Sequence, residues 1–303
     1  MSQVPSLRRQ LAGESIVVAP GVYDGLSASL AERAGFTALY LSGASIAYTR
    51  FGRPDIGLIG MSEVAETLSV IRERVDLPIV ADADTGFGNA LNVQRTVALF
   101  ERSGAQAIQI EDQTLPKRCG HLAGKTLIPP GEMVGKIKAA LDARRAADTI
   151  IIARTDAVAV EGLEAALERA ERYAAAGAEI IFVEAPRSHA DLAAIVSRIG
   201  TRAMTMANMV EGGATPITDA AALQSLGFRM VIFPGGLVRA VARLMDDYFA
   251  SLRRHGSNEP FRKEMFDFAT LNDILGTAKI LESGRRYDGE NFPPAPAKKG
   301  AAE

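Results

Sequence analysis

Cysteine is nearly absent from this sequence of 303 residues, which has a single one at position 119. An internal disulfide is therefore impossible, and a reducing compartment fits this composition. Long apolar runs are missing as well. No stretch approaches the length of a membrane span, and the first residues lack the apolar core of a signal peptide. These absences lead us to expect a soluble, cytoplasmic protein.

Charge of one sign is not in excess either. The 34 basic residues nearly balance the 36 acidic ones, which leaves a formal net charge of −2. This balance argues against nucleic acid or a membrane surface as a partner, and we expect a small molecule instead. Hydrophobic residues make up 48% of the chain, enough for a large core. The length suits one α/β barrel with short extensions.

Eight short apolar segments recur between stretches with helical spacing. They are apolar throughout rather than alternating, which is typical of buried parallel strands. They span 16–19, 38–41, 78–81, 107–110, 150–153, 180–183, 203–206 and 230–233. In the helical stretch 163–174, the apolar positions fall on one face, and Glu164, Glu168 and Arg169 are predicted to face away from them.

A weak internal repeat supports a closed barrel. Four segments, 34–43, 103–112, 176–185 and 226–235, share one layout in which a glycine precedes an apolar strand. A glycine at the end of the preceding helix adopts the left-handed conformation at low cost. Repeated helix, glycine and strand favour a (β/α)8 TIM barrel. A doubly wound open sheet is the alternative, but no Gly-rich dinucleotide fingerprint follows the first strand.

The C-terminal part lies outside the eight units. We predict that the barrel and a short N-terminal helix occupy 1–257, and that C-terminal helices occupy 258–287, with helical spacing over 261–284. The segment 288–303 is rich in proline and lysine and has no apolar period, so it is predicted to be a disordered tail.

Polar residues follow the predicted strands in series, as expected if the barrel is an enzyme, because such barrels carry their chemistry at the C-terminal ends of the strands. Any one of these residues is explained by a cap, but chance would scatter the whole set over both ends. The series contains Ser42, Gly43, Asp82, Asp84, Glu111, Asp112, Arg154, Thr155, Asp156, Glu184, Asn208 and Glu211.

The acidic motif ADADTGFGN (81–89) predicts a metal site. Asp82 and Asp84 are two residues apart at a strand end, and extended backbone directs such positions to the same side. With Glu111 and Glu184 nearby, these carboxylates cannot all be ionised without partners, and a divalent cation resolves the repulsion. Oxygen ligands favour Mg²⁺ or Mn²⁺, whereas three scattered histidines disfavour zinc. The alternative is that the two aspartates are helix caps or belong to a turn.

The segment KRCGH (117–121) places the only cysteine between cations and a histidine, in a polar loop with glycines. We expect this setting to lower the pKa of the Cys119 thiol and to make it an acid or a nucleophile. Glycines near the loop ends would let it close as a lid. The alternative is an exposed cationic loop with an incidental cysteine.

Two arginines are candidates for binding anions. Arg154 stands at a strand end, where a guanidinium can hold a carboxylate with two hydrogen bonds. Arg239 follows two glycines near the start of the eighth helix and is a candidate for a second anion. For Arg239 the alternative is an ordinary charge on a helix surface.

These motifs resemble the isocitrate lyase/phosphoenolpyruvate mutase superfamily, and the likeness extends from about residue 20 to 287. The segments that carry it are YLSG (40–43), ADADTGFGN, IED (110–112), KRCGH, ARTDA (153–157), VEA (183–185) and NMVEGGATP (208–216). The resemblance implies Mg²⁺ held through Asp82 and Asp84, largely by way of water. It also implies a 2-oxo acid bound to that metal, and a homotetramer that exchanges C-terminal helices between subunits.

The resemblance also implies roles for individual residues. Cys119 is the acid that protonates the enolate formed when a carbon–carbon bond breaks, and Lys117, His121 and Glu111 complete the catalytic set. The positions that match the substrate site are Ser42, Gly43, Ala44, Gly120, Arg154, Glu184 and Asn208, and we add Tyr40 and Arg239 as further substrate-binding candidates. We therefore expect a Mg²⁺-dependent lyase that cleaves a substituted malate, such as 2,3-dimethylmalate or a methylisocitrate-like acid, into a 2-oxo acid and a carboxylic acid.

Two departures from the methylisocitrate lyases bear on the substrate. Leu271 stands where those enzymes carry an arginine for a further carboxylate, and Glu211-Gly212-Gly213 replaces their Thr-Glu-Phe-Gly. Both features resemble the dimethylmalate lyase and petal-death-protein branch. Three alternatives stay open: oxaloacetate hydrolase activity, a carboxyvinyl-carboxyphosphonate phosphonomutase, against which Cys119 argues, and a non-catalytic ligand-binding barrel, against which the intact polar set argues.

Overall fold

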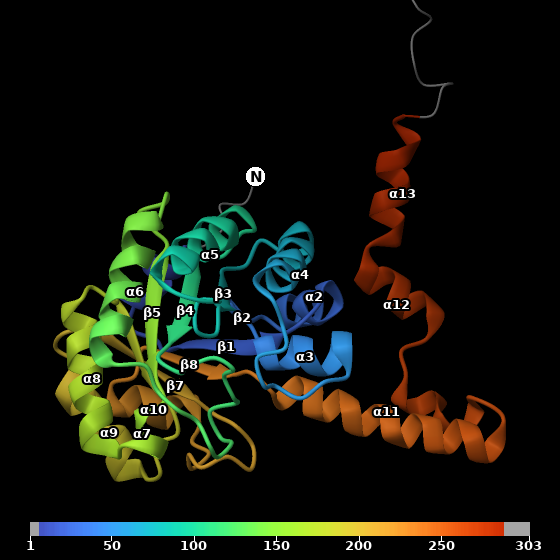
Figure 1. Cartoon of the computed structure of the whole chain (residues 1–303). Coiled ribbons are helices and arrows are strands. Elements are labelled where there is room, and N and C mark those ends of the chain that lie inside the picture. Colours follow the sequence, from blue (N-terminus) through green and yellow to red (C-terminus); the bar gives the residue numbers. More distant parts are fainter. Residues whose placement is uncertain (1–5, 288–303) are drawn as a thin grey trace, which may run out of the picture. The chain divides into compact units, whose positions relative to one another are not determined.

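Eight parallel strands close into a barrel in the computed structural model, which describes residues 6–287 (Figure 1). The strands follow one another around the barrel in chain order, and β8 pairs with β1. They are β1 (Val17–Val22), β2 (Leu39–Leu41), β3 (Ile79–Asp82), β4 (Ala107–Glu111), β5 (Ile150–Thr155), β6 (Ile180–Val183), β7 (Met204–Asn208) and β8 (Met230–Phe233). The predicted TIM barrel is confirmed.

The strand bounds differ from the predicted ones mainly at the C-terminal ends. β5 and β7 continue two residues further than predicted, through Thr155 and Asn208, and β4 includes Glu111. Polar side chains at these positions end the apolar run, but their backbones still lie in strands paired with the next strand. The polar residues of the series therefore stand on the last residues of the strands, which fixes their direction more firmly than a loop does.

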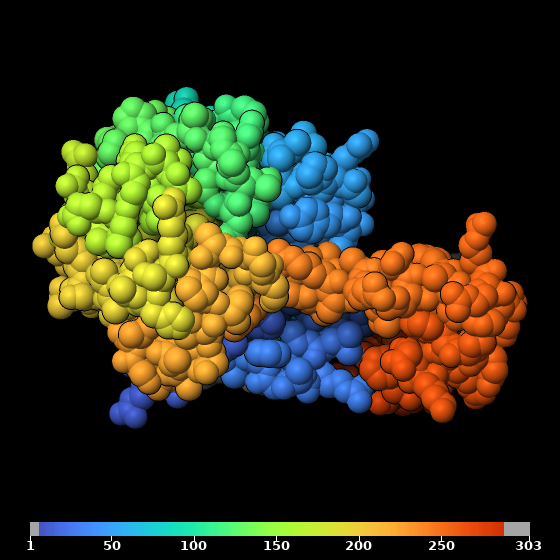
Figure 2. Space-filling model, turned by 90° about the horizontal axis from the view of Figure 1, so that it is seen from below, coloured from blue at the N-terminus to red at the C-terminus, as the bar shows by residue number. Residues whose placement is uncertain are grey.

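Helices cover the outside of the barrel and alternate with the strands (Figure 1). Side chains of Asp24, Ser42, Asn89, Ser188 and Asp219 accept backbone N–H bonds at helix starts, as N-caps do. The helices are α2 (Gly25–Arg33), α3 (Gly43–Phe51), α4 (Met61–Arg74), α5 (Ala90–Arg102), α6 (Pro130–Ala143), α7 (Ala157–Val160), α8 (Leu163–Ala175), α9 (His189–Ile199) and α10 (Ala220–Leu226). In Figure 2 the first and last barrel units, blue and orange, meet on the surface, as the pairing of β1 with β8 requires.

The repeated glycines have the backbone conformation that the sequence predicts. Gly35, Gly104, Gly177 and Gly227 have φ between 89° and 105°, a region that residues with a side chain rarely adopt. Each follows a helix and precedes a strand. The four glycines thus turn the chain from the outer helices back into the barrel.

A short helix, α1 (Leu7–Ala12), closes the N-terminal end of the barrel. Leu7 and Leu11 are buried in the same cluster as the inward-facing side chains of the strands. The Leu7 N–H donates to Gln106 just before β4, and the Arg229 guanidinium just before β8 donates to the carbonyls of Leu11 and Gly13. The opposite, C-terminal end of the barrel is left for the polar series.

One prediction about helix faces is wrong. Arg169 in α8 is buried rather than turned to solvent, and its guanidinium donates to Asp112, Glu161 and the Ile128 carbonyl. Helical spacing alone places Arg169 outside the apolar stripe. Its long side chain instead reaches an acidic residue beneath the C-terminal end of β4, because a buried carboxylate needs a charged partner.

The last helices belong partly to a second compact unit. Contacts within the chain group Met1–Leu244 and Met245–Glu303 into two units, so the division falls inside α11 (Gly236–His255). The predicted helical stretch 261–284 is divided into η1 (Glu259–Glu264), α12 (Phe268–Leu275) and α13 (Thr277–Arg285). Asp267 caps α12, and Gly276, with φ 74°, separates α12 from α13. The predicted tail 288–303 lies outside the described residues.

Within the part of the chain that the structure describes, none of the helices combines the length and the apolarity needed to cross a membrane.

Candidate active site

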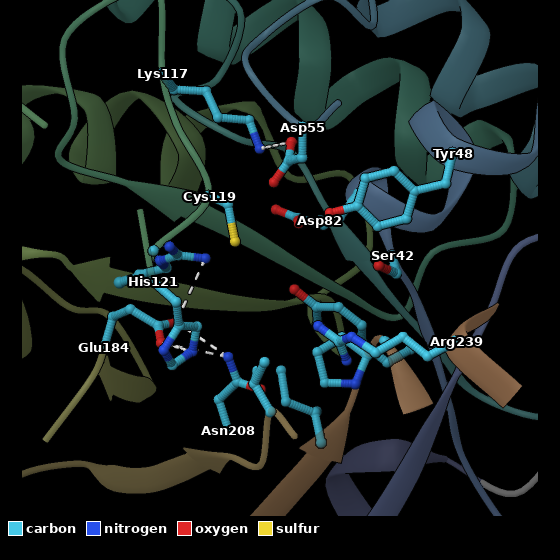
Figure 3. A pocket seen from close by; sticks show the side chains of 18 residues that line it. Ser42, Tyr48, Asp55, Asp82, Lys117, Cys119, His121, Glu184, Asn208 and Arg239 are labelled. Atoms are coloured by element: carbon cyan, nitrogen blue, oxygen red, sulfur yellow. Dashed lines mark hydrogen bonds and ion pairs between the residues drawn. The ribbon is translucent and has the colours of Figure 1, made fainter. Parts of the chain in front are cut away.

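A cavity opens at the C-terminal ends of the barrel strands (Figure 3). Every predicted site residue lines it except Gly43, Asp84 and Glu111, which lie beside Asp82. The lining residues are Tyr40, Ser42, Ala44, Tyr48, Asp55, Asp82, Lys117, Cys119, Gly120, His121, Arg154, Glu184, Asn208, Val210, Ile232, Pro234, Gly235 and Arg239. The structure thus brings together residues that the sequence spreads over some two hundred positions.

The acidic cluster consists of Asp82, Asp84 and Glu111. Each offers an oxygen within 4.8 Å of the others, and all three side chains are buried. Asp82 ends β3 and Glu111 ends β4, which are neighbours in the barrel. The predicted reason for the position of Asp84 is wrong: its φ of 45° is left-handed and not extended, so a turn brings it to the site.

Further contacts hold that turn. The Asp84 carbonyl accepts the Glu111 N–H at 2.8 Å, and the Thr85 carbonyl accepts the buried Lys136 ammonium of α6 at 3.0 Å. Gly86 and Phe87 continue the turn with positive φ values of 82° and 59°. A strained backbone of this kind persists only where its surroundings fix it, and such strain is concentrated at functional sites.

The two aspartates have protein partners, contrary to the expectation that only a metal would balance them. Lys117 Nζ lies 2.6 Å from an oxygen of Asp84 and 2.6 Å from an oxygen of Asp55. Gln109 donates to Asp82 at 3.1 Å, and its own carbonyl accepts the Tyr40 hydroxyl. One ammonium group cannot neutralise so many buried carboxylates, so a need for further positive charge persists.

The pKa values of the acidic cluster reflect this shortage of positive charge. Burial, together with the charges of Asp82 and Asp55, raises the pKa of Asp84 to about 6 although Lys117 opposes the rise. Burial and repulsion from Asp156 and Asp84 raise the pKa of Glu111 well above its ordinary value, against the attraction of Arg154. Both Glu111 carboxylate oxygens are buried without a hydrogen-bond donor, although Arg154 Nε lies 3.3 Å from one of them.

The donor set fits a hard divalent cation. Carboxylate oxygens are the ligands that Mg²⁺ and Mn²⁺ prefer. Gly43 keeps the adjoining space open, since an added Cβ would lie 3.5 Å from Asp82 Oδ2. Of the three histidines only His121 lines the cavity, so a zinc site built on histidines is not formed by the described residues.

The wall next to the acidic cluster carries Arg154 and Glu184, and Arg154 pairs with Glu111 of the cluster. Asp156 orients the Arg154 guanidinium through two hydrogen bonds of 2.9 and 3.0 Å. Glu184 accepts from Asn208 at 3.1 Å, and His121 Nε2 lies 3.0 Å from its other oxygen. Burial alone would raise the pKa of Glu184, but Arg154 and His121 outweigh it and lower that pKa to about 2.

The loop that carries Cys119 lies across the cavity. Figure 3 shows the Cys119 sulfur pointing toward its centre, with Lys117 turned to Asp55. The Cys119 N–H donates to the Asp55 carbonyl at 3.1 Å. Gly120 packs so closely on the wall of Arg154 and Glu184 that an added Cβ would lie 2.5 Å from Arg154 Nη2 and from Glu184 Cγ.

The predicted effect of this setting on the thiol is wrong in sign. Burial raises the pKa of Cys119 above its ordinary value, although the His121 backbone N–H and Arg154 oppose the rise. Its two cationic neighbours in sequence do not face the sulfur: Lys117 pairs with Asp55 and Asp84, and Arg118 donates to the Ala123 carbonyl at the surface. A thiol that keeps its proton is suited to be an acid rather than a nucleophile.

Two further contacts complete the cavity. His121 Nδ1 accepts the Ala214 N–H at 3.1 Å, which ties the Cys119 loop to the segment after β7. Arg239 at the start of α11 donates to Glu211 at 2.7 Å, and both side chains are about half exposed. Arg239 therefore lines the cavity as a cation whose partner, Glu211, an anionic ligand could replace.

Some functional candidates were not predicted. Asp55 and Tyr48 line the cavity, yet neither follows a strand. Gln109 lies inside β4 and is fully buried. The only sign of it in the sequence is that a polar residue interrupts an apolar run. Leu271, discussed as the replacement of a family arginine, lies in α12 of the second unit and is 38% exposed.

Comparisons with known proteins point to one family. The family model described as Phosphoenolpyruvate phosphomutase matches residues 7–253. A protein of Eubacterium barkeri named 2,3-dimethylmalate lyase is 40% identical over 95% of this chain and 99% of its own length. A 2-methylisocitrate lyase of Aeropyrum pernix is 46% identical over 89% of this chain and 86% of its own. A solved phosphonopyruvate hydrolase in complex with oxalate and Mg²⁺ superposes with a TM-score of 0.85 at 30% identity, covering 95% of this chain and 99% of that one.

Proposed function

The chain belongs to the phosphoenolpyruvate phosphomutase family, and on that premise we propose that it is a Mg²⁺-dependent carbon–carbon lyase. Its substrate is a malate-type 2-hydroxy dicarboxylate substituted at C2 or C3, with 2,3-dimethylmalate as the first candidate. The products are a 2-oxo acid and a carboxylic acid. The names of the relatives from Eubacterium barkeri and Aeropyrum pernix support cleavage of this kind.

The observation that carries the proposal is the position of Cys119. Its sulfur points into a cavity that Arg154 lines and that borders the acidic cluster. A protonated thiol has a clear use in carbon–carbon cleavage, where a carbanion must receive a proton. It has no evident use in moving a phosphoryl group, which is why the lyase is favoured over a phosphonomutase.

Asp82, Asp84 and Glu111 would hold the metal, together with water. When bound, Mg²⁺ supplies a Lewis acid that stabilises the developing 2-oxo acid. Its presence in the structure of phosphonopyruvate hydrolase supports this choice of ion. Lys117, fixed between Asp55 and Asp84, supplies a permanent positive charge next to the same cluster.

The bond changes balance with the residues present. The C2 hydroxyl loses its proton to a carboxylate of the acidic cluster, with Glu111, whose two oxygens have no hydrogen-bond donor, as the first candidate. The C2–O bond becomes a carbonyl while the C2–C3 electron pair leaves with C3 as an enolate of the departing acid. Cys119 Sγ–H then donates its proton to C3, and the cationic groups of the cavity stabilise the enolate before that transfer.

The cations of the cavity set the number of carboxylates that it accepts. Lys117 is held by two aspartates. Asp156 accepts from Nε and one terminal nitrogen of Arg154, which leaves the other terminal nitrogen of Arg154, together with Arg239, as the cationic groups that we assign to the substrate. Arg154 binds the carboxylate of the 2-oxo end, and Arg239 binds the second carboxylate in exchange for Glu211. The remaining predicted substrate-binding residues surround the substrate: Tyr40, Ser42, Gly43, Ala44, Gly120, Glu184 and Asn208.

A substrate panel tests the proposal. We expect malate-type dicarboxylates to exceed methylisocitrate in kcat/KM by roughly tenfold or more, because a third carboxylate would be buried without a cation. Products from malates, citrates, oxaloacetate and phosphonopyruvate with Mg²⁺ are measured by mass spectrometry. If methylisocitrate is the best substrate, the protein is a methylisocitrate lyase and the proposed substrate is wrong. Turnover of phosphonopyruvate alone, or of nothing, would refute the lyase.

For the assembly we propose a cytoplasmic homotetramer. The second unit supports association, because large apolar side chains of α11 to α13 are exposed, among them Phe249, Phe268, Ile280 and Leu281. Light scattering coupled to size-exclusion chromatography measures the mass. A monomer at micromolar concentration would contradict the tetramer.

A further inference from the structure

The loop that carries Cys119 has a buried cation at its far end. The Lys125 side chain is only 1% exposed, and its ammonium donates to the Gly120 carbonyl and, at 3.2 Å, to an oxygen of Asp156. We infer that Lys125 is a positioning residue, which holds the Cys119 loop over the cavity by joining it to the wall that carries Arg154. It touches neither the acidic cluster nor the cavity itself.

The base of the loop is closed independently of Lys125. Gln113 and Leu127 form an antiparallel bridge, and the Thr114 N–H donates to the Thr126 carbonyl at 2.9 Å. The Gln113 side chain also donates to the Arg118 carbonyl and accepts the Arg118 N–H. These bonds fix the two ends of the loop near the barrel, but none of them reaches across the cavity.

Asp156 gives Lys125 a rigid anchor. Its backbone N–H donates to Asp112, and its carboxylate accepts the two hydrogen bonds of Arg154. Asp112 in turn accepts from the Thr155 hydroxyl and from Tyr173 and Arg169 of α8. A chain of buried hydrogen bonds therefore runs from an outer helix to the Lys125 ammonium.

The contact with Asp156 is the one that ties the loop to the barrel, because Lys125 and Gly120 both lie in the segment 113–127 and Asp156 lies outside it. Gly120 lies against Arg154 and Glu184 with no room for a side chain, and its carbonyl receives the Lys125 ammonium from the other side. An ammonium group buried without acceptors is costly, so Lys125 favours the conformation in which both acceptors are in place. Loss of Lys125 removes that preference and leaves the Gly120 carbonyl without this donor.

The single cysteine makes the position of the loop measurable without substrate or metal. Because Cys119 is the only thiol among the 303 residues and is only partly exposed in the seated loop, its rate of reaction with the disulfide reagent DTNB rises when the loop leaves the cavity. The assay does not depend on which reaction the enzyme catalyses. Failure of the positioning role is therefore distinguishable from failure of the proposed lyase.

We expect the limiting rate of Cys119 modification to rise roughly tenfold to a hundredfold in Lys125→Met, the scale of lost hydrogen bonds to a charged group. Lys125→Arg keeps a cation and should show a smaller rise. Lys138→Met, an exposed lysine of α6, is the matched control and should react like wild type. A pH series separates access from thiol ionisation, because loss of a cation can only raise the thiol pKa and slow the reaction at a given pH.

A rate for Lys125→Met within twofold of wild type, with unchanged circular dichroism, would overturn the inference. Should Lys125→Met fail to fold, Lys125→Gln takes its place, because its neutral amide fills the buried site but loses the charge that pairs with Asp156, and its rate should also rise more than twofold. Trypsin cleavage after Arg118, an exposed site in the same loop, gives a second readout. The rate of cleavage must rank the variants as the thiol reaction does, with Lys125→Met fastest, Lys125→Arg next, and Lys138→Met equal to wild type. Equal cleavage rates in all variants would also overturn the inference.

Discussion

Lys117 and the carboxylates around it decide how the acidic cluster behaves at neutral pH. Lys117 lies 2.6 Å from both Asp55 and Asp84, yet the pKa of Asp84 is still raised to about 6. One buried ammonium is therefore not enough, and a divalent cation at the cluster would relieve the remaining repulsion. The carboxylates can bind a proton or a metal but cannot remain together as bare anions at low cost.

Removal of metal tests that balance. EDTA should abolish activity and Mg²⁺ or Mn²⁺ should restore it, because the cluster cannot stabilise the product without the ion. Asp84→Ala should resemble the chelated enzyme and should lose Mn²⁺ binding measured by electron paramagnetic resonance. Asp142→Ala, an exposed acid on α6, is the control and should keep both properties. Full activity in a thoroughly demetallated sample would exclude a catalytic metal.

Glu184 gives the protein an acid-sensitive contribution to its stability. Its pKa in the folded state is about 2, below the ordinary 4.5, because Arg154 and His121 favour the carboxylate. Its contribution is therefore complete above pH 4.5 and is lost as the pH falls from 4.5 toward 2, to a total of about 3 kcal/mol. Asp84 and Glu111, whose pKa values are raised, act in the opposite direction.

Urea unfolding of wild type and Glu184→Gln isolates this contribution. The difference in unfolding free energy between the two proteins should be largest at pH 6 to 7 and smaller by about 1 kcal/mol at pH 3.5. Glu168→Gln, an exposed residue of the neighbouring α8, serves as the control and should show no such trend. A difference that stays constant from pH 6 to pH 3.5 would mean that Glu184 is not held as a carboxylate.

Among the elements of the fold, the segment 113–127 is the one that completes the cavity. It carries Lys117, Cys119, Gly120 and His121, and it contacts the turn with Asp55, the wall with Glu184 and the segment with Ala214. Its contacts reach several barrel units at once. Small changes in how it is seated therefore alter the acid, the cation and the substrate walls together.

Gly120→Ala tests the seating directly. The added Cβ would lie 2.5 Å from Arg154 Nη2 and Glu184 Cγ, so the loop or the guanidinium must move. We expect kcat/KM to fall by roughly tenfold or more, because misplacement by about 1 Å is costly in catalysis. Gly135→Ala inside α6 has nothing within 4 Å and should keep activity while stabilising the helix slightly. Equal kinetics in both variants would show that the tight packing at Gly120 is unimportant.

How far the elements could be predicted depends on the kind of signal. The eight strands and the helix-ending glycines were predictable because buried parallel strands are uniformly apolar and Gly35, Gly104, Gly177 and Gly227 need a positive φ. The burial of Arg169 was not predictable, because its partner Asp112 lies 57 residues earlier in the chain. Contacts between distant residues leave no local pattern in a single sequence.

The candidate site shows the same division. Residues at strand ends, such as Asp82, Glu111 and Arg154, were predictable because a barrel gathers them at one rim. Asp55 follows no strand and was missed, and Asp84 was predicted for a wrong backbone reason. The pKa of Cys119 was predicted in the wrong direction, since the sequence shows its cationic neighbours but not that they point elsewhere.

In the whole molecule three features meet: a closed barrel that gathers carboxylates at one rim, a loop that carries the Cys119 thiol to the same cavity, and two arginines that line it, Arg154 and Arg239. Prediction of an enzyme of the isocitrate lyase/phosphoenolpyruvate mutase superfamily is confirmed by the family match and by relatives named as lyases. The proposed function requires that Cys119 delivers a proton to carbon after the C2–C3 bond breaks.

That claim is tested most directly by cleavage of the best malate-type substrate in heavy water, with wild type and Cys119→Ser compared by NMR. The account predicts one deuterium on the released acid, at the carbon that carried the bond. It also predicts that Cys119→Ser loses roughly 10²- to 10⁴-fold in turnover, the usual effect of removing a positioned general acid. Binding of oxalate should change little. Near-native turnover by Cys119→Ser, or a released acid without deuterium, would contradict the account.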